Sequence, residues 1–266
     1  MLNTETLEGF ESRSFEALGT ERTVFRRGTG PGVVVMTEAP GITPEVAGFA
    51  RRVADEGYSV ALPLLFGVPG KPISGGYVAS TILRACVSRE FHVLASHRSS
   101  PITDWLRALA RDLHAEVGGP GVGAIGMCLT GNFALALMME PCLLAPVLSQ
   151  PSLPFGITAE RRAALHVSPE ELANAKRRSA EGVTVLGLRF TGDPMCRAER
   201  FETLRRELGE GFEGIEIDSS PGNPHDLPGM AHSVVTTDLV DKTGHPTLAA
   251  LDRVFSLFDE RLRSAG

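Results

Sequence analysis

The stretch GAIGMCLTGNFALAL, residues 123 to 137, carries the strongest local signal in the chain. An apolar run that ends at Ile125 predicts a strand, residues Gly126 to Gly131 predict a sharp turn, and the small apolar residues that follow predict a helix. This succession is typical of a nucleophile elbow of the G-x-S-x-G type, with Cys128 in the place of the serine. The second glycine follows Cys128 by three residues rather than two.

Small residues are expected around such a nucleophile because its backbone is strained and other backbone passes close to it. The helix that follows would direct its free N–H groups and the positive end of its dipole at Cys128, which favours a thiolate. A second interpretation is that Cys128 is a buried cysteine in an ordinary strand–helix turn of an α/β protein. The local motif does not decide between the two interpretations.

The composition is that of a globular protein, and the length suits one α/β domain over residues 1–266. The net charge is −6 with no basic tract, which argues against nucleic-acid binding. The N-terminus lacks the basic and apolar segments of a signal peptide. The longest apolar run, Val60 to Val68, is too short to span a bilayer. We therefore expect a cytoplasmic protein without membrane association.

The cysteines give no sign of a metal site or of disulfide bonds. The four of them, at positions 86, 128, 142 and 196, form no C-x-x-C pair, and their spacings with the histidines match no zinc pattern. Reduced thiols in a cytoplasm are the expected state. We expect neither a metal nor an organic cofactor.

Apolar strand-like runs alternate with helical patterns along the chain. Several runs are continuous and β-branched, which favours strands that are buried on both faces, as in a parallel sheet. The expected strands are Thr23–Arg26, Gly32–Thr37, Ser59–Leu64, Gly121–Gly126, Pro146–Ser149, Val183–Phe190 and Gly214–Ile217. The expected helices are Thr43–Glu56, Ile102–Val117, Asn132–Met139, Pro169–Ala180, Glu199–Glu207 and Pro246–Leu262. This alternation predicts an open, doubly wound, mostly parallel sheet flanked by helices.

In a doubly wound sheet the chemistry takes place outside the carboxyl ends of the strands. Glu38 follows the run VVVM, Cys128 lies in the elbow, and Asp193 follows the run VTVLGLRF. A later loop, PHDLPGMAHSVV, carries His232. The order nucleophile, acid, histidine is that of α/β-hydrolases and differs from the orders in chymotrypsin and subtilisin.

These residues resemble the dienelactone hydrolase family, the cysteine-nucleophile branch of the α/β-hydrolases. The resemblance rests on Glu38, Gly-x-Cys128-x-x-Gly, Thr-Gly-Asp193 and Ala-His232-Ser, in the family's order. It implies the α/β-hydrolase fold, with Cys128 as nucleophile, His232 as its base and Asp193 as the group that orients the histidine. It further implies that Glu38 holds the resting thiol through a hydrogen bond and takes part in its activation.

The resemblance also implies an oxyanion hole formed by the backbone N–H groups of Leu129 and Ala39, since Pro40 has no N–H. Dienelactone hydrolases proper are associated with arginines that hold the carboxylate of the substrate, one of them shortly after the catalytic histidine. The five residues after the histidine of this chain include no arginine. Arg98 is the candidate for the other arginine, although its sequence context favours a solvated loop residue near a helix start. Dienelactone itself is therefore not the expected substrate.

The chemistry of these residue types agrees with the resemblance. A cysteine thiol titrates near pH ~8.5 and is mostly protonated at neutral pH, so that a positioned base is needed. An imidazole can take that proton and later deliver it to a leaving group, and a carboxylate on its other nitrogen fixes the tautomer. The oxyanion of a tetrahedral intermediate needs donors already in place, each worth roughly 3 kcal/mol.

Each residue taken alone has a simpler interpretation: Asp193 as a turn or cap, His232 as a surface histidine, Glu38 as the start of a turn. His225 is a rival for the base, but the apolar residues around His232 favour the latter. The combination predicts a hydrolase that cleaves a small ester, lactone or thioester through an acyl-cysteine. A non-catalytic binding or regulatory protein on the same scaffold, and an acyltransferase that uses the same acyl-enzyme, stay open as alternatives.

Overall fold

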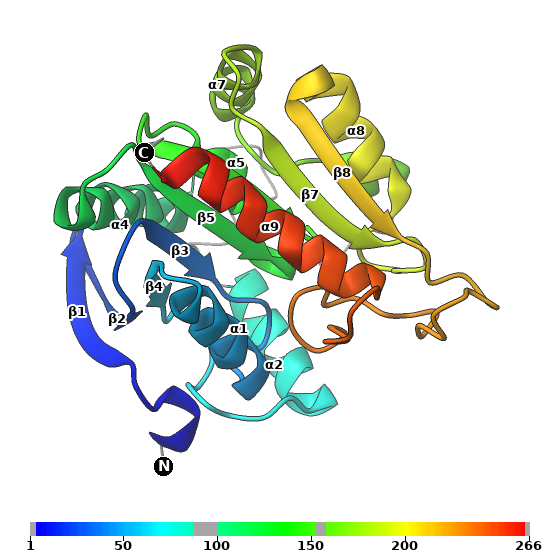
Figure 1. Ribbon diagram of the computed structural model, residues 1–266, viewed down its shortest axis with the longest axis horizontal. Coiled ribbons are helices and arrows are strands. Elements are labelled where there is room, and N and C mark those ends of the chain that lie inside the picture. Colours follow the sequence, from blue (N-terminus) through cyan, green and yellow to red (C-terminus); the bar gives the residue numbers. More distant parts are fainter. Residues whose placement is uncertain (1–3, 88–99, 153–157, 264–266) are drawn as a thin grey trace.

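An eight-stranded sheet in the order β1-β2-β4-β3-β5-β6-β7-β8 runs through the molecule (Figure 1). The structure is a computed structural model and describes residues 4–87, 100–152 and 158–263. Strand β2 is antiparallel to both of its neighbours, and the other strand pairs are parallel. The strands are β1 Glu11–Ala17, β2 Thr20–Arg27, β3 Gly32–Met36, β4 Ser59–Pro63, β5 Val122–Met127, β6 Leu143–Ser149, β7 Val185–Phe190 and β8 Phe212–Ile217.

Helices cover both faces of the sheet, which confirms the doubly wound arrangement predicted from the sequence. Helices α1 (Pro44–Asp55) and α9 (Pro246–Leu262) pack on one face. On the other face lie α4 (Pro101–Val117), α5 (Phe133–Leu137), α7 (Pro169–Ala180) and α8 (Ala198–Leu208). The remaining helical segments are α2 (Gly75–Val87), α6 (Ala159–Ala163) and the 3-10 turns η1 (Thr4–Leu7), η3 (Cys128–Thr130) and η4 (Gly209–Gly211).

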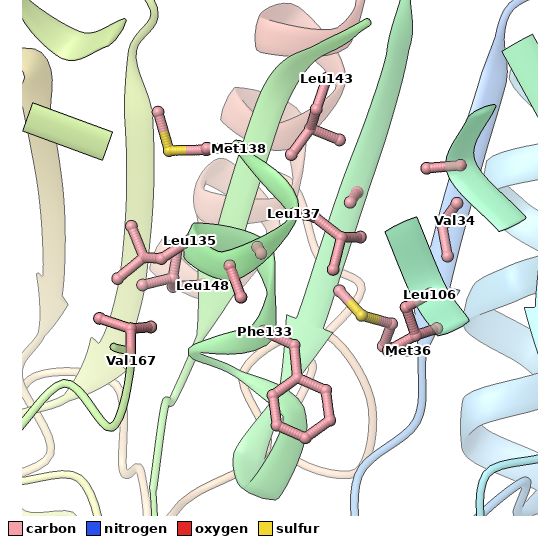
Figure 2. Close-up of a cluster of buried hydrophobic side chains, with 14 of the residues drawn as sticks. Val34, Met36, Leu106, Phe133, Leu135, Leu137, Met138, Leu143, Leu148 and Val167 are labelled. Carbon is pink, nitrogen blue, oxygen red and sulfur yellow. The ribbon is translucent and has the colours of Figure 1, made fainter. Parts of the chain in front are cut away.

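Each face of the sheet has its own apolar core because successive residues of a strand point to opposite faces. Strand β3 sends Val34 and Met36 into the core shared with α5, and Val33 and Val35 into the core shared with α1 and α9. In the first of these cores, Leu137 projects from α5 toward the sheet (Figure 2). Burial of each such side chain contributes about 1.5–3 kcal/mol to folding. This two-sided burial is why the central strands are continuous apolar runs.

Several predicted helices occur with the expected bounds. Helices α7 and α9 match the predicted ranges, and α1 begins at Pro44 after its N-cap, where Thr43 Oγ1 accepts a hydrogen bond from the N–H of Val46 at 3.2 Å. The helix after the elbow is shorter than predicted, since α5 covers Phe133–Leu137 instead of Asn132–Met139. The 3-10 turn η3 lies between β5 and α5, so the N–H groups next to Cys128 belong to this short turn and not to an α-helix.

Strand β1 and helices α2 and α6 are not predicted from the sequence. Strand β1 has the sequence ESRSFEA and lies at the edge of the sheet, where most of its residues are exposed, so it lacks an apolar run. It joins β2 through a tight turn at Leu18 and Gly19, whose φ angles are 54° and 72°. No helix in the described ranges is both long and apolar enough to cross a membrane.

The carboxyl ends of β3, β5, β6 and β7 are neighbours at one edge of the sheet. Met127 of β5 pairs with Ser149 of β6, so Cys128 and Gln150 leave the sheet at the same level. The strand order reverses direction between β3 and β5, and ligands of doubly wound proteins bind at such a switch point. The fold therefore brings three of the predicted residues, Glu38, Cys128 and Asp193, to one edge.

Candidate active site

Cys128 lies in a strained, closely packed turn at the end of β5. Its φ is 52°, a left-handed conformation that is uncommon for a residue with a side chain. A Cβ added to Gly126 would lie 2.1 Å from the carbonyl oxygen of Thr130, and one added to Gly131 would lie 2.4 Å from Cα of Pro151. Close backbone approach therefore requires both glycines of the G-x-C-x-x-G pattern.

Thr130 ties the elbow to the end of β3. Its Oγ1 accepts a hydrogen bond from the N–H of Met127 at 3.0 Å and lies 3.1 Å from the carbonyl oxygen of Met36 and 3.2 Å from that of Thr37. The residue is fully buried. It occupies the position of the second glycine in G-x-S-x-G, and its hydroxyl joins two neighbouring strand ends at the site.

The side chains of Asp193 and His232 meet although 39 residues separate them in the sequence. Nδ1 of His232 lies 2.6 Å from Oδ2 of Asp193, and Oδ1 of Asp193 accepts a hydrogen bond from the N–H of Met195 at 2.8 Å. The two loops are in close contact, because a Cβ added to Gly192 would lie 2.4 Å from the carbonyl oxygen of Gly229. A carboxylate on Nδ1 fixes the tautomer that leaves Nε2 free for proton transfer.

Nε2 of His232 is buried and has no hydrogen-bond partner of good geometry within the described part of the chain. Cys128 nevertheless lies close enough to affect the charge of the imidazole. Burial by itself lowers the pKa of His232, but the Cys128 thiolate and the hydrogen bond with Asp193 outweigh it and raise that pKa well above its ordinary value. Asp193 and the sulfur thus both favour the imidazolium form.

Asp238 holds the backbone of the loop that carries the histidine. Its Oδ2 accepts hydrogen bonds from the N–H groups of His232 at 2.8 Å and Ser233 at 2.9 Å. The rival histidine lies elsewhere: the His225 ring packs edge-to-face against that of His245, the N-cap of α9, with ring centroids 5.2 Å apart. Of the two histidines, it is His232 that contacts Asp193.

Glu38 is buried and accepts hydrogen bonds from three side chains. Its Oε2 receives one from Nε2 of Gln150 at 3.0 Å and one from Oγ of Ser233 at 2.7 Å, and its Oε1 receives one from Oγ1 of Thr236 at 2.5 Å. Burial raises the pKa of Glu38 above its ordinary value, although these hydrogen bonds and the neighbouring His232 act in the opposite direction. Glu38 thereby joins the end of β3 to the end of β6 and to the histidine loop.

The expected hydrogen bond between Glu38 and the resting thiol is not found among the described residues. Ser152, by contrast, contacts the sulfur, since its Oγ lies 3.4 Å from Sγ of Cys128. Neither Gln150 nor Ser152 is predicted from the sequence. Both follow β6, the strand next to β5. Because the chemistry of a doubly wound sheet takes place outside the carboxyl ends of its strands, a search of the residues after β6 would identify them.

Each of the two residues expected to form an oxyanion hole directly follows one of the candidate site residues in the sequence. Leu129 is the second residue of the 3-10 turn η3, which begins at Cys128, and the first N–H groups of a helix have no partner inside it. Ala39 directly follows Glu38, and in the described residues no backbone acceptor is found for its N–H. Arg98 lies outside the described residues. Within the described ranges, no cluster of three or more His, Cys, Asp or Glu side chains is arranged to hold a metal ion.

A sequence model of the dienelactone hydrolase family matches residues 19–227, which include Glu38, Cys128 and Asp193 but end before His232. No curated protein matches the chain. A solved dienelactone hydrolase-like promiscuous phosphotriesterase from metagenomic libraries is 19% identical, with 96% of this chain and 98% of that one covered and a TM-score of 0.58.

Two further solved structures are similar over nearly the full chain. A dienelactone hydrolase from Anabaena variabilis is 13% identical, with 96% of this chain and 98% of that one covered and a TM-score of 0.59. A cold-adapted esterase from an Arctic intertidal metagenomic library is 11% identical, with 96% and 94% covered and a TM-score of 0.58. At these identities the structural similarity shows the fold alone. The family model shows the family, because it matches most of the sequence. The chain belongs to the dienelactone hydrolase family, a family of hydrolase enzymes with the α/β-hydrolase fold.

Proposed function

We propose that this enzyme hydrolyses a small ester, lactone or thioester through an acyl-cysteine intermediate, with Cys128, His232 and Asp193 as its triad. The contact of 2.6 Å between Nδ1 of His232 and Oδ2 of Asp193 carries the proposal. It is supported by the left-handed backbone of Cys128, with a φ of 52°, at the end of the neighbouring strand β5. A carboxylate-oriented imidazole beside a thiol in a strained elbow is the arrangement that cysteine nucleophiles need.

In the first half-reaction, Nε2 of His232 takes the thiol proton and the sulfur attacks the carbonyl carbon of the substrate. The negative charge that develops on the carbonyl oxygen is met by the N–H groups of Leu129 and Ala39. The intermediate collapses, the bond to the leaving alcohol or thiol breaks, and His232 returns the proton to that leaving group. The products of this half are the free leaving group and the acylated Cys128.

In the second half-reaction, His232 takes a proton from a water molecule that attacks the acyl carbon. The same N–H donors meet the second oxyanion, the bond from carbon to sulfur breaks, and the thiolate recovers its proton from the imidazolium. The acid product and the starting enzyme are formed. Asp193 stabilises the imidazolium in both halves and stays ionised throughout.

In this proposal Glu38 has two candidate roles. Its hydrogen bonds to Ser233 and Thr236 support a role in holding the histidine loop. The family resemblance implies a different role, in which the carboxylate forms a hydrogen bond with the thiol of Cys128. The two roles predict different pH profiles for the Glu38→Gln variant.

The substrate class is proposed from the chemistry of the site and from what the similar proteins are described as hydrolysing. The solved neighbours include an esterase and a promiscuous phosphotriesterase. We therefore propose neutral carboxylic esters and thioesters as the first class to test, with lactones beside them and a phosphotriester as an additional probe. An acyltransferase differs only in the acceptor that reaches the acyl-enzyme.

The proposal is tested by trapping the acyl-enzyme. The protein is mixed with each probe, quenched with acid within the first turnovers, and analysed by intact mass and peptide mapping, with the Cys142→Ala variant as a control for a second half-exposed thiol. We expect an adduct with the mass of the acyl group on the peptide that contains Cys128, and its loss to water. Turnover with the acyl group on another residue would contradict the proposal, and decay only in the presence of an added alcohol or amine would favour a transferase.

A further inference from the structure

We propose that Ser152 is a further catalytic residue of this site, whose hydroxyl binds the Cys128 sulfur and redirects its hydrogen bond when the thiolate forms. Its importance for turnover rests on the function proposed above, whereas its effect on the sulfur can be measured separately.

The hydroxyl of Ser152 lies between the sulfur and a backbone carbonyl. Its Oγ is 3.4 Å from Sγ of Cys128 and 2.9 Å from the carbonyl oxygen of Gln150. The residue is buried, and its backbone N–H donates a hydrogen bond to the carbonyl oxygen of Cys128 at 3.0 Å. Both its backbone and its side chain are thus joined to the elbow.

A hydroxyl has one proton to donate and two lone pairs with which to accept, so its two neighbours cannot both receive its proton at once. Beside the neutral thiol, Ser152 donates to the carbonyl oxygen of Gln150 and can accept the S–H of Cys128. When His232 takes the thiol proton, the sulfur becomes an acceptor only, and rotation of the hydroxyl turns its proton toward the negative charge. The serine proton never leaves its oxygen, so the step adds no proton transfer to the reaction.

The surrounding packing fixes the position of Ser152. The preceding residue, Pro151, has its carbonyl oxygen held by Nη1 of Arg200 at 2.5 Å. A Cβ on Gly131 would lie 2.4 Å from Cα of Pro151, so the segment also packs directly on the turn after the elbow. A hydroxyl held in this way loses little freedom when it binds the sulfur, which makes its hydrogen bond more effective.

Arg200 also adds a positive charge next to the segment that carries Pro151 and Ser152. The side chain is buried, and its three hydrogen bonds go to the carbonyl oxygens of Pro151, Ala164 and Arg161. It forms no ion pair within the residues that the structure describes. Burial lowers the pKa of Arg200, and the nearby Cys196, Asp193 and Cys128 sulfur act in the opposite direction. A buried cation near the sulfur favours the thiolate that Ser152 would bind.

The test measures the alkylation rate of Cys128 by iodoacetamide across pH in the wild type and in Ser152→Ala, with peptide mapping to separate Cys128 from the other thiols. Because a hydrogen bond to a charged group is lost, we expect the rate below the midpoint of the profile to fall by roughly tenfold or more, and the midpoint to move to higher pH. Ser179→Ala, which removes a buried serine hydroxyl from α7, is the matched control and should leave the profile unchanged.

A second pair of variants separates the hydroxyl from packing. Threonine and valine have nearly the same shape and differ in the hydroxyl. Ser152→Thr and Ser152→Val therefore show whether the hydroxyl sets the midpoint of the alkylation profile, even if Ser152→Ala does not fold. We expect the threonine variant to keep the lower midpoint and the valine variant to lose it.

Identical alkylation profiles for wild type, Ser152→Ala and Ser152→Val would overturn the inference, whatever happens to hydrolysis. A shifted profile in a protein whose Cys128→Ala variant still turns over substrate would instead contradict the proposed function and leave the contact at the sulfur in place. The two failures are therefore distinguishable.

Discussion

Oγ of Ser233, the residue after His232, donates a hydrogen bond to Oε2 of Glu38 at 2.7 Å, across 195 residues of sequence. Thr236 donates a hydrogen bond to the other oxygen of the same carboxylate. Glu38 therefore contacts the loop that carries His232, whereas Asp193 contacts the imidazole ring itself. In this structure the carboxylate at the end of β3 therefore contacts the loop of the proposed base, and the hydroxyl of Ser152 contacts the sulfur.

The Glu38→Gln variant keeps the shape of the side chain and removes its charge. If Glu38 activates the thiol, the pH profile of kcat/KM should shift, because that profile reports ionisations of the free enzyme. If Glu38 only holds the loop, the profile should keep its shape with a moderate loss in rate. The comparison with His232→Ala, which should lower kcat strongly at every pH, separates a change in placement from the loss of the base.

The thermal stability of the same variant should reveal the burial of the carboxyl group. Because the pKa of Glu38 is raised in the folded protein, the wild type is most stable relative to Glu38→Gln below the ordinary titration range of a glutamate, near pH ~4.3. That advantage should be lost as the pH rises through the raised pKa of the folded state. A difference in Tm between the two proteins that does not change with pH would show that burial does not perturb this carboxyl group.

The Asp193→Asn variant should lower kcat/KM by about 10²–10⁴-fold without unfolding the protein, because an amide can present the wrong partner to Nδ1 and cannot stabilise the imidazolium. The pKa of His232 should fall at the same time, since its hydrogen bond with Asp193 is one of the causes that raise it. Steady-state kinetics and a titration of the histidine by NMR measure the two effects. An unchanged His232 pKa in this variant would mean that Asp193 does not set the charge of the ring.

Cys128 should react with iodoacetamide faster than the other thiols. Burial raises the pKa of Cys196 and of Cys142, and the carboxylate of Glu140 adds to this effect at Cys142. The Cys128 side chain is partly exposed and has the imidazole of His232 nearby. Peptide mapping after short exposures ranks the four cysteines, including Cys86, whose side chain lies outside the described part. Faster labelling of another cysteine, both with and without a product-like ligand, would be the contrary result.

The Gly126→Ala variant should destabilise the protein by about 1–3 kcal/mol, as overpacking of a close-packed turn does. Its Cβ would lie 2.1 Å from the carbonyl oxygen of Thr130, so the elbow backbone would have to move. Gly48→Ala is the matched control: Gly48 lies inside α1 with open space around it, and alanine there should stabilise the protein by about 0.5–1 kcal/mol. Urea unfolding of the three proteins compares the two changes, and equal effects would contradict the close packing of the elbow.

The sequence predicts the parts of this molecule that depend on local patterns. The elbow at Cys128 and the helix with Thr43 as its N-cap follow from turn residues, caps and periodicity, and both occur. The exposed edge strand β1 cannot be predicted from an apolar run, because it is a strand through its pairing with β2.

The contacts of the site are less predictable, because they join segments that lie far apart in the sequence. The pairing of Asp193 with His232 is implied by the family resemblance, and the structure brings the two together. The partners of Glu38 depend on how the histidine loop packs over the ends of β3 and β6, which no local pattern encodes. The same holds for Ser152, whose relation to Cys128 follows only from the neighbouring positions of β5 and β6.

The role of Cys128 as nucleophile is tested most directly by the turnover of the Cys128→Ala variant on a probe that the wild type hydrolyses, with Cys142→Ala as the control. The side chain stands in a turn at the strand end, so its truncation should leave the circular dichroism spectrum and the fold intact. We predict that Cys128→Ala loses hydrolysis to the level of the uncatalysed reaction while Cys142→Ala retains the wild-type rate. Hydrolysis at the wild-type rate by a folded Cys128→Ala protein would contradict the assignment of Cys128 as the nucleophile.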